Sequence, residues 1–287
     1  MARLFGLIGN RADIAGSVLA AELASDRVSF SRVKLPPGGA DALGWGVGFF
    51  QGGELLLRRR PIDDHPDVEV AGLVRDIRGD VIISQVRAAT VGAHATENTQ
   101  PFRHRQWLLA ATGSLDQFAT LRPRLLASIP DFLRNSIAGE TEGELLLYLF
   151  LSCLRDSGHL DDSRVDPRSA RAALTSCVAT VDAFAAEVGA APLAMNILLS
   201  DGESLLALHR GEAMFIRTVA GKSEIEPLIA NVSRRQVTAH ELAHARFAIV
   251  ASDFDTEPSA AWRAVPRGSV VSLTRDGEVS TIPLSPP

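Results

Sequence analysis

Cysteine is scarce in this sequence: the 287 residues include only Cys153 and Cys177. Neither has the spacing of a metal site and both lie in apolar, helix-like stretches, so we predict buried, inert thiols of a reducing compartment. No run of about 18 apolar residues is present, which argues against a membrane-spanning helix. A basic segment followed by a long apolar one, typical of a secretory signal, is also missing from the N-terminus. We therefore expect a cytoplasmic protein with no membrane partner.

An excess of positive charge is absent as well. The formal net charge is −5 and the isoelectric point is about 5.8, which argues against nucleic acid as a partner. The composition, 46% hydrophobic and 22% charged, is that of an ordinary globular protein with a sizeable core. Because no internal repeat, low-complexity segment or linker divides the chain, we predict one domain over residues 1–287.

The apolar patterns predict an α+β fold. A strand is expected directly after the initiator Met, ending at Gly9-Asn10, and two hairpins are expected to turn at Gly52-Gly53 and Asp201-Gly202. Further predicted elements are helices over 12–25, 68–77, 121–154 with a break at 135–141, and 167–189, strands over 79–90 and 105–115, a loop over 35–44, and only strands and turns beyond 193. Two stacked sheets with helices outside them account for this order.

The string HELAH has the spacing of the H-E-x-x-H zinc motif. On a helix, His240 and His244 would share one face, with Glu241 beside them as a base. The string is short and no third ligand has a recognisable spacing, so a solvated helix is the favoured interpretation. We expect no metal and no cofactor.

Two other stretches allow a functional and a structural interpretation. GWGVG, from Gly44 to Gly48, lacks the Lys and Ser/Thr of a phosphate-binding loop, which favours a strand whose glycines admit another backbone. Arg87 ends an otherwise apolar strand, where it is either exposed or held for a ligand carboxylate, which its planar guanidinium binds bidentately.

Taken together, the short motifs form a recognisable series. In order they are RLFG at residue 3, GWGVGFF, VRAATVG, ENTQPF, WLLAATG, ETEGELL, LLSDGESLLALHR and VASDFDTEP followed by Trp. This series, from residue 2 to roughly residue 270, resembles the class II glutamine amidotransferases, in particular the stand-alone kind that includes the γ-glutamyl hydrolase of ergothioneine biosynthesis. The resemblance implies the N-terminal-nucleophile hydrolase fold, a four-layer αββα arrangement with two antiparallel sheets between helices.

The resemblance also implies a catalytic site in which this chain departs from the family. Residue 2 of the family is a cysteine that becomes N-terminal and attacks the glutamine amide, whereas this chain has Ala2. Thr112, before Gly113, stands where the family has an asparagine that donates to the oxyanion. Losing one such donor typically costs about 10²–10³ in rate. Gln85 and Gln100 stand where related sequences commonly carry histidine.

The resemblance implies that the substrate-binding positions are largely kept. Arg87 would bind the α-carboxylate, with Thr90 and Gly92 following it, and Glu142 stands where the family has the aspartate that holds the α-amino group. We therefore favour a member without glutaminase activity that binds a glutamine-like or γ-glutamyl-like molecule or a protein partner. The alternatives are an amidohydrolase that uses Thr112 or Ser114, a laboratory Cys-to-Ala form of an active γ-glutamyl hydrolase, and a structural subunit with a closed pocket.

Overall fold

The computed structural model describes residues 3–24, 32–34, 42–61, 67–89, 93, 95–230, 238–252, 254 and 258–284. Its described strands form two large antiparallel sheets and a short ribbon. The seven-stranded sheet has the order β13 (Arg263–Ala264), β11 (Met214–Ala220), β12 (Arg246–Ser252), β1 (Arg3–Gly9), β6 (Val81–Ala89), β3 (Ala42–Gln51) and β4 (Glu54–Pro61). The six-stranded sheet has the order β15 (Val279–Pro283), β14 (Ser269–Thr274), β10 (Ser204–His209), β9 (Ala194–Ser200), β8 (Trp107–Ser114) and β7 (Phe102–His104), and the ribbon pairs β2 (Arg32–Lys34) with β5 (Asp67–Glu69).

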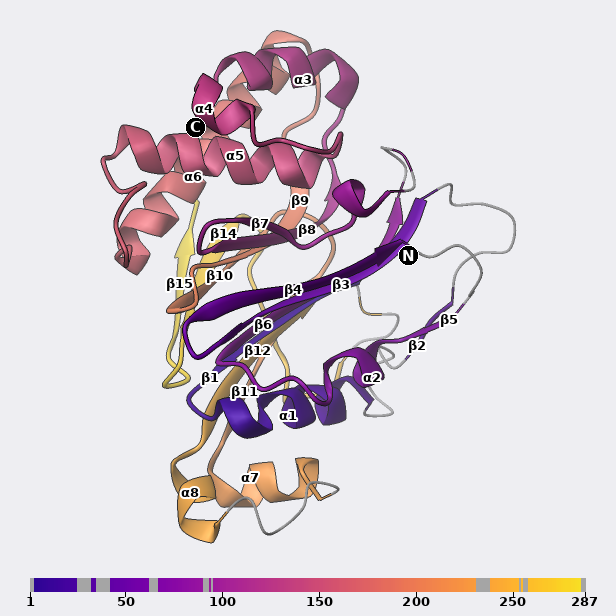
Figure 1. Cartoon of the computed structure of the whole chain (residues 1–287), viewed down its shortest axis with the longest axis vertical. Coiled ribbons are helices and arrows are strands. Elements are labelled where there is room, and N and C mark those ends of the chain that lie inside the picture. Colours follow the sequence, from indigo (N-terminus) through magenta and orange to yellow (C-terminus); the bar gives the residue numbers. More distant parts are fainter. Residues whose placement is uncertain are drawn as a thin grey trace.

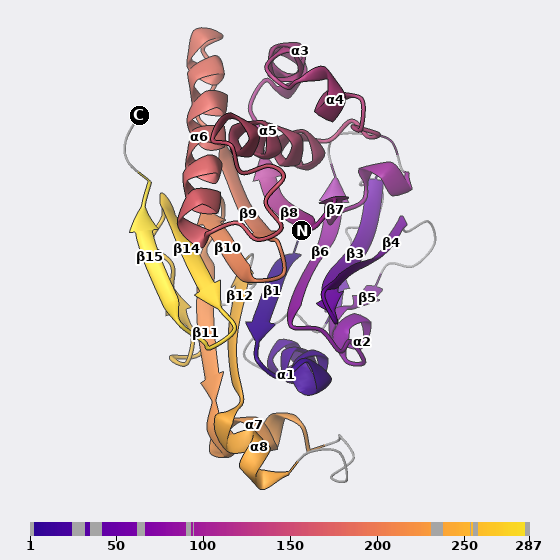
Figure 2. The same ribbon diagram turned by 60° about the vertical axis from the view of Figure 1, so that its left-hand side comes forward.

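The two sheets stack face to face between two layers of helices (Figure 1). One outer layer contains α3 (Phe118–Ala127), α4 (Asp131–Arg134), α5 (Glu142–Asp156) and α6 (Pro167–Glu187), and the other contains α1 (Ala12–Ala24) and α2 (Val70–Val74), with α7 (Gly221–Leu228) and α8 (Ala239–His244) below them. Figure 2 shows the same order of layers from a second direction. The predicted αββα arrangement of two antiparallel sheets is confirmed.

Three separate groups of buried side chains fill the three spaces between the layers, because side chains alternate in direction along each strand. In β1, Leu4 and Ile8 belong to the group between the two sheets. Phe5 and Leu7 of the same strand belong to the group under α1. The initial strand is therefore buried on both faces, which explains why it is apolar throughout.

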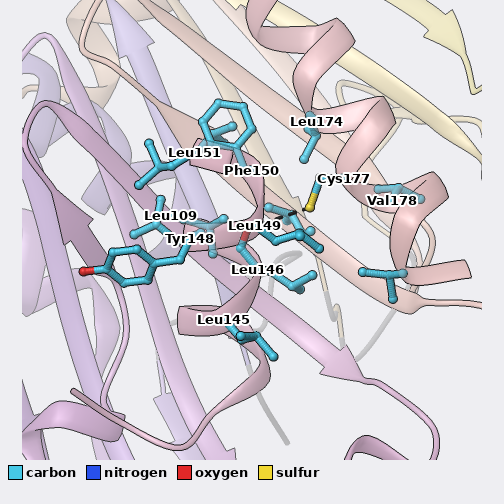
Figure 3. Close-up of a cluster of buried hydrophobic side chains, with 14 of the residues drawn as sticks. Leu109, Leu145, Leu146, Tyr148, Leu149, Phe150, Leu151, Leu174, Cys177 and Val178 are labelled. Atoms are coloured by element: carbon cyan, nitrogen blue, oxygen red, sulfur yellow. Dashed lines mark hydrogen bonds between the residues drawn. The ribbon is translucent and has the colours of Figure 1, made fainter. Parts of the chain in front are cut away.

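The third group packs α5 and α6 on the outer face of the six-stranded sheet (Figure 3). Cys177 is buried in this group, whereas Cys153 is half-buried, so the prediction of two buried thiols is correct only for Cys177. Burial raises the pKa of the Cys153 thiol to about 11 and that of Cys177 well above its usual value. Both therefore stay protonated near neutral pH, as expected of unreactive thiols.

Pairing between strands corrects two predictions in the first hundred residues. Residues 42–44 were predicted to lie in a loop, but they begin β3, where Gly44 pairs with Arg87. The helix predicted over 68–77 is reduced to α2, because Val68 pairs with Val33 in the β2–β5 ribbon. The rest of the predicted loop, residues 35–41, lies outside the described residues.

The predictions for the C-terminal third and the central helices are also incomplete. Beyond residue 193 strands and turns were predicted apart from the solvated helix at HELAH, which is α8, whereas α7 was not predicted and packs Ile225 against the seven-stranded sheet. The long helical region breaks a second time before α4, at Pro130. In the part of the chain described here, no helix combines the length and apolar character needed to cross a bilayer.

Candidate functional site

The predicted site residues lie on strands and a helix that meet at one end of the two sheets. Arg3, the first residue of β1, pairs with Val86 of β6. The next residue of β6, Arg87, pairs with Gly44 of β3. β6 of the seven-stranded sheet also lies against β8 of the six-stranded sheet (Figure 2). The starts of β1 and β3 and the ends of β6 and β8 thus lie together.

Two glutamine side chains hold the backbone of β8 immediately before Thr112. The N–H of Ala111 donates to Oε1 of Gln100 at 2.6 Å, and Nε2 of Gln85 donates to the carbonyl oxygen of Ala111 at 3.4 Å. Gln85 is 2% exposed and Gln100 is 6% exposed. The Oε1 atom of Gln85 is buried with no hydrogen-bond partner.

Glycines allow Gln100 to reach this position. A Cβ on Gly46 would lie 2.0 Å from the carbonyl oxygen of Gln100, and a Cβ on Gly44 would lie 3.0 Å from the side chain of Thr99. A Cβ on Gly143, in the first turn of α5, would lie 3.3 Å from Cδ of Gln100. The interpretation of GWGVG as a strand whose glycines admit another backbone is confirmed.

Replacement of Gly46 by alanine is expected to destabilise the protein by about 1–3 kcal/mol, because the added methyl group must displace the Gln100 backbone. The measurement is the thermal unfolding midpoint. Gly72→Ala in α2 is the matched control, since its Cβ would meet only the flexible side chain of Glu69, at 3.4 Å. That variant should melt at or above the wild-type temperature. A Gly46→Ala protein as stable as the control would contradict the close-approach explanation.

Thr112 and Gly113 lie near the end of β8, where this strand pairs with β9. Thr112 pairs with Asn196 and is 4% exposed. Gly113 has a φ of +105°, and a Cβ there would lie 2.3 Å from the carbonyl oxygen of Ala194, so only glycine fits. The side chain of Asn196 is already engaged, since it donates to Glu212 and accepts from the backbone of Arg210 and Gly211. Ser114, the last residue of β8, is exposed.

The first turn of α5 forms the other side of the site, and it contains Glu142. Thr141 is the N-cap residue, but its hydroxyl oxygen caps no backbone group and is buried without a partner. Glu144 is 6% exposed and accepts the backbone N–H groups of Ala138 at 3.0 Å and Gly139 at 2.6 Å. The turn before α5 is therefore fixed by a carboxylate inside the helix.

Asn98 joins that turn to the loop that contains Gln100. Its amide nitrogen donates to the carbonyl oxygen of Ala93 at 2.9 Å, and its oxygen accepts the N–H of Glu140 at 2.8 Å. Arg59 of β4 supports the loop from below by donating to the carbonyl oxygen of Thr99 at 3.3 Å. Burial lowers the pKa of Arg59, while the nearby carboxylates of Glu144 and Glu97 favour its charged form. The loop is thus supported by the half-buried guanidinium of Arg59, which lies near the carboxylates of Glu144 and Glu97.

Not all of the predicted site lies within the described residues. Ala2, Thr90 and Gly92 lie outside them, and so does the side chain of Arg87. Contacts connect the rest, because Gln85 and Gln100 both hold Ala111, next to Thr112, and Gln100 touches Gly143, next to Glu142. The supporting residues Asn98, Glu144 and Arg59 were not predicted, since their partners are backbone groups that no sequence pattern identifies.

Two further features lie away from this end of the sheets. In α8, Glu241 forms a capping box with Thr238, so this carboxylate serves to begin the helix. Within the described ranges, no three His, Cys, Asp or Glu side chains are grouped as a metal site requires. A cavity of about 360 Å³ lies on the other side of the seven-stranded sheet, between α1, residues 75–78 and the end of α7.

Comparison with known families gives a match to the model of the class II glutamine amidotransferases over residues 21–286. Among curated proteins, the chain is 24% identical over 226 residues to the "Probable glutamine amidotransferase DUG3" of Saccharomyces cerevisiae, covering 71% of this chain and 59% of that protein. It is 31% identical over 118 residues to the γ-glutamyl-hercynylcysteine sulfoxide hydrolase of Mycobacterium tuberculosis, covering 41% of this chain and 51% of that protein. The chain thus aligns with less than two thirds of either relative.

Solved structures share the fold at low sequence identity. A "glutamine aminotransferase class-II domain protein" from Silicibacter pomeroyi has a TM-score of 0.58 at 17% identity, covering 99% of this chain and 100% of that one. A predicted glutamine amidotransferase from Pseudomonas aeruginosa has a TM-score of 0.57 at 18% identity, covering 96% of this chain and 98% of that one. At these identities the likeness concerns the fold alone.

Proposed function

Because the chain belongs to the class II glutamine amidotransferases, we propose that it binds glutamine or a γ-glutamyl compound without hydrolysing it. The observation that carries this proposal is the alanine at residue 2. The family reaction requires a thiolate at that position, and a methyl group cannot attack a carbonyl carbon. Ala2 directly precedes β1 in the sequence, and Arg3, the first residue of β1, pairs with Val86 of β6, the residue after Gln85.

A second difference from the family supports the same conclusion. Thr112 replaces the asparagine that would donate to the oxyanion, and it follows the backbone held by Gln85 and Gln100. A natural loss of the glutaminase reaction explains both Ala2 and Thr112, whereas a laboratory substitution of the nucleophile alone would leave the asparagine in place. We therefore propose a natural member of the family that no longer catalyses this reaction.

Binding is proposed to outlast catalysis because residues for both charged ends of an amino acid remain. Arg87, with Thr90 and Gly92 after it, would hold the α-carboxylate, and Glu142 would hold the α-ammonium group. The first turn of α5 is fixed by Glu144, which keeps the backbone of Glu142 in place.

We further propose that residues 1–287 act as one domain in the cytoplasm. If the pocket is closed, we propose that the outer surface of the domain recognises a protein partner.

Titration calorimetry combined with an ammonia assay tests the proposal. We expect glutamine to bind with a dissociation constant of about 1 mM or tighter, or about −4 kcal/mol, and no ammonia to be released above background. Alanine, which lacks the γ-carboxamide, is the control ligand. If neither glutamine, glutamate nor a γ-glutamyl peptide binds, the pocket is not retained. Ammonia release that is abolished by Thr112→Ala with Ser114→Ala would instead support an amidohydrolase with another nucleophile.

A further inference from the structure

We propose that Gln85 and Gln100 form a polar clamp on the Ala111 peptide that positions Thr112 and Gly113 at the end of β8. The inference rests on the proposed function, since Thr112 and Gly113 belong to the proposed ligand site. Gln85 and Gln100 are positioning residues in this account, because the described structure shows them acting on the backbone of β8. Neither is proposed to react with a ligand.

The direction of the two hydrogen bonds supports the clamp. In an extended strand, the N–H and C=O of one residue point to the same side. Both groups of Ala111 point away from β9, since they bind Gln100 and Gln85. On that side β7 pairs with β8 only as far as Leu109, opposite Phe102. The two side-chain amides therefore take the place of a strand partner for Ala111, the residue before Thr112.

Each glutamine has a fixed polarity in the clamp. Gln100 must present its oxygen, because the Ala111 N–H is a donor, and Gln85 must present its NH2 group, because the Ala111 carbonyl is an acceptor. Turning the Gln100 amide around would place its NH2 group against the Ala111 N–H, and turning the Gln85 amide around would place its oxygen against the Ala111 carbonyl oxygen. Both side chains are buried, and the side chain of Gln100 lies so close to Gly143 that a Cβ there would be 3.3 Å from its Cδ. The clamp is thus a donor at position 85 and an acceptor at position 100.

The strand β8 connects the clamp to Thr112 and Gly113 of the proposed ligand site. Alternation along β8 turns the backbone groups of Thr112 toward β9, where Thr112 pairs with Asn196. The N–H of Gly113 then points to the same side as that of Ala111, which is the side of the clamp. A shift of the Ala111 peptide would therefore change the direction of the Gly113 N–H at the end of β8.

Hydrogen exchange of the Ala111 amide, followed by NMR on the full chain, tests the clamp. Gln100→Met removes the acceptor and should speed exchange by about tenfold or more. Gln100→His accepts only when neutral, so with a histidine pKa near 6.5 it should protect Ala111 at about pH 8 and lose that protection at about pH 5, after correction for intrinsic exchange. Gln85→His is the matched control, because a ring N–H donates in both protonation states, and its Ala111 exchange should differ from wild type by less than about twofold at either pH. The chemical shift of the Gly113 amide should change in the same variants, and at the same pH values, in which the exchange rate of the Ala111 amide changes.

Two outcomes would overturn the clamp: Ala111 exchange in Gln100→Met within about twofold of wild type, or pH-independent protection in Gln100→His. The comparison of one folded Gln100→His protein at two pH values decides the matter even if Gln100→Met does not fold. Calorimetry with glutamine on the wild type is run beside it. If glutamine does not bind while Ala111 exchange behaves as expected, the proposed function fails and the clamp stands.

Discussion

The double variant Ala2→Cys with Thr112→Asn is expected to release ammonia from glutamine, while neither single variant does so above background. The thiol introduced at residue 2 would restore the group that attacks the amide, once Met1 is removed to free the α-amine. The side-chain amide introduced at residue 112 would restore the donor to the oxyanion at the end of β8. Without that donor, the Ala2→Cys protein is expected to turn over about 10²–10³ times more slowly than the double variant. Thr112→Asn alone has no nucleophile and should stay inactive.

The control for this experiment tests the alignment around residue 112. Ser114 lies two residues farther along β8 and is exposed, whereas Thr112 is buried. Ala2→Cys with Ser114→Asn therefore places an equivalent amide at the wrong distance, and we expect no gain over Ala2→Cys alone. If the Thr112 double variant folds but stays inert, then either residue 112 is not the oxyanion position or Glu142 no longer accepts the substrate ammonium group. Calorimetry with glutamine on that variant distinguishes the two, since only the second removes binding.

Replacement of Arg87 by alanine is expected to weaken glutamine binding by roughly 10- to 100-fold. A hydrogen bond to a charged group contributes about 1.5–3 kcal/mol, and each 1.4 kcal/mol is about tenfold in affinity. Glutamine α-amide, which has no α-carboxylate, should bind the wild type more weakly by a similar factor. It should lose little further affinity in Arg87→Ala, because the interaction is already missing. Calorimetry on the four combinations measures the coupling directly.

Arg58→Ala serves as the matched control for Arg87→Ala. Arg58 is exposed on β4, where it pairs with Val47 at the edge of the seven-stranded sheet. Its removal changes the net charge of the protein by the same amount without touching the site, so glutamine affinity should stay within about twofold of wild type. Equal losses in both variants would point to a general charge effect, and no loss in Arg87→Ala would remove Arg87 from the binding site.

The fold could be predicted to a large extent, because its signals are local. β1, α1, the β3–β4 hairpin and α6 all follow from apolar periodicity and turn residues within each segment. The short helices were harder to predict. α7 is eight residues long and contains Pro227, so its periodic pattern is too brief to stand out, and the burial of Ile225 that stabilises it is a tertiary contact.

The string T-x-x-E, which indicates a capping box, occurs at two helix starts with different outcomes. At Thr238–Glu241 the box forms as the sequence indicates, and both of these side chains are exposed. At Thr141–Glu144 it does not form. Glu144 instead accepts the N–H groups of Ala138 and Gly139, and the Thr141 hydroxyl is left unpartnered. The difference arises because Glu144, unlike the exposed Glu241, is buried, and its carboxylate is satisfied by the two N–H groups of the preceding turn, of which Gly139 is itself buried.

The sequence by itself determined the layered α+β fold, the family, and the absence of a thiol at residue 2, because each depends on residue types in a fixed order along the chain. Only the tertiary structure decided which side chains lie together at the end of the sheets where β1 begins and β8 ends. Gln85 and Gln100 lie on separate segments, and they converge on Ala111 because β6 and β8 of opposite sheets pack against each other. Gly46 admits the Gln100 backbone for the same reason. Hydrogen bonds between distant segments depend on three-dimensional distance, and the sequence contains no local signal for them.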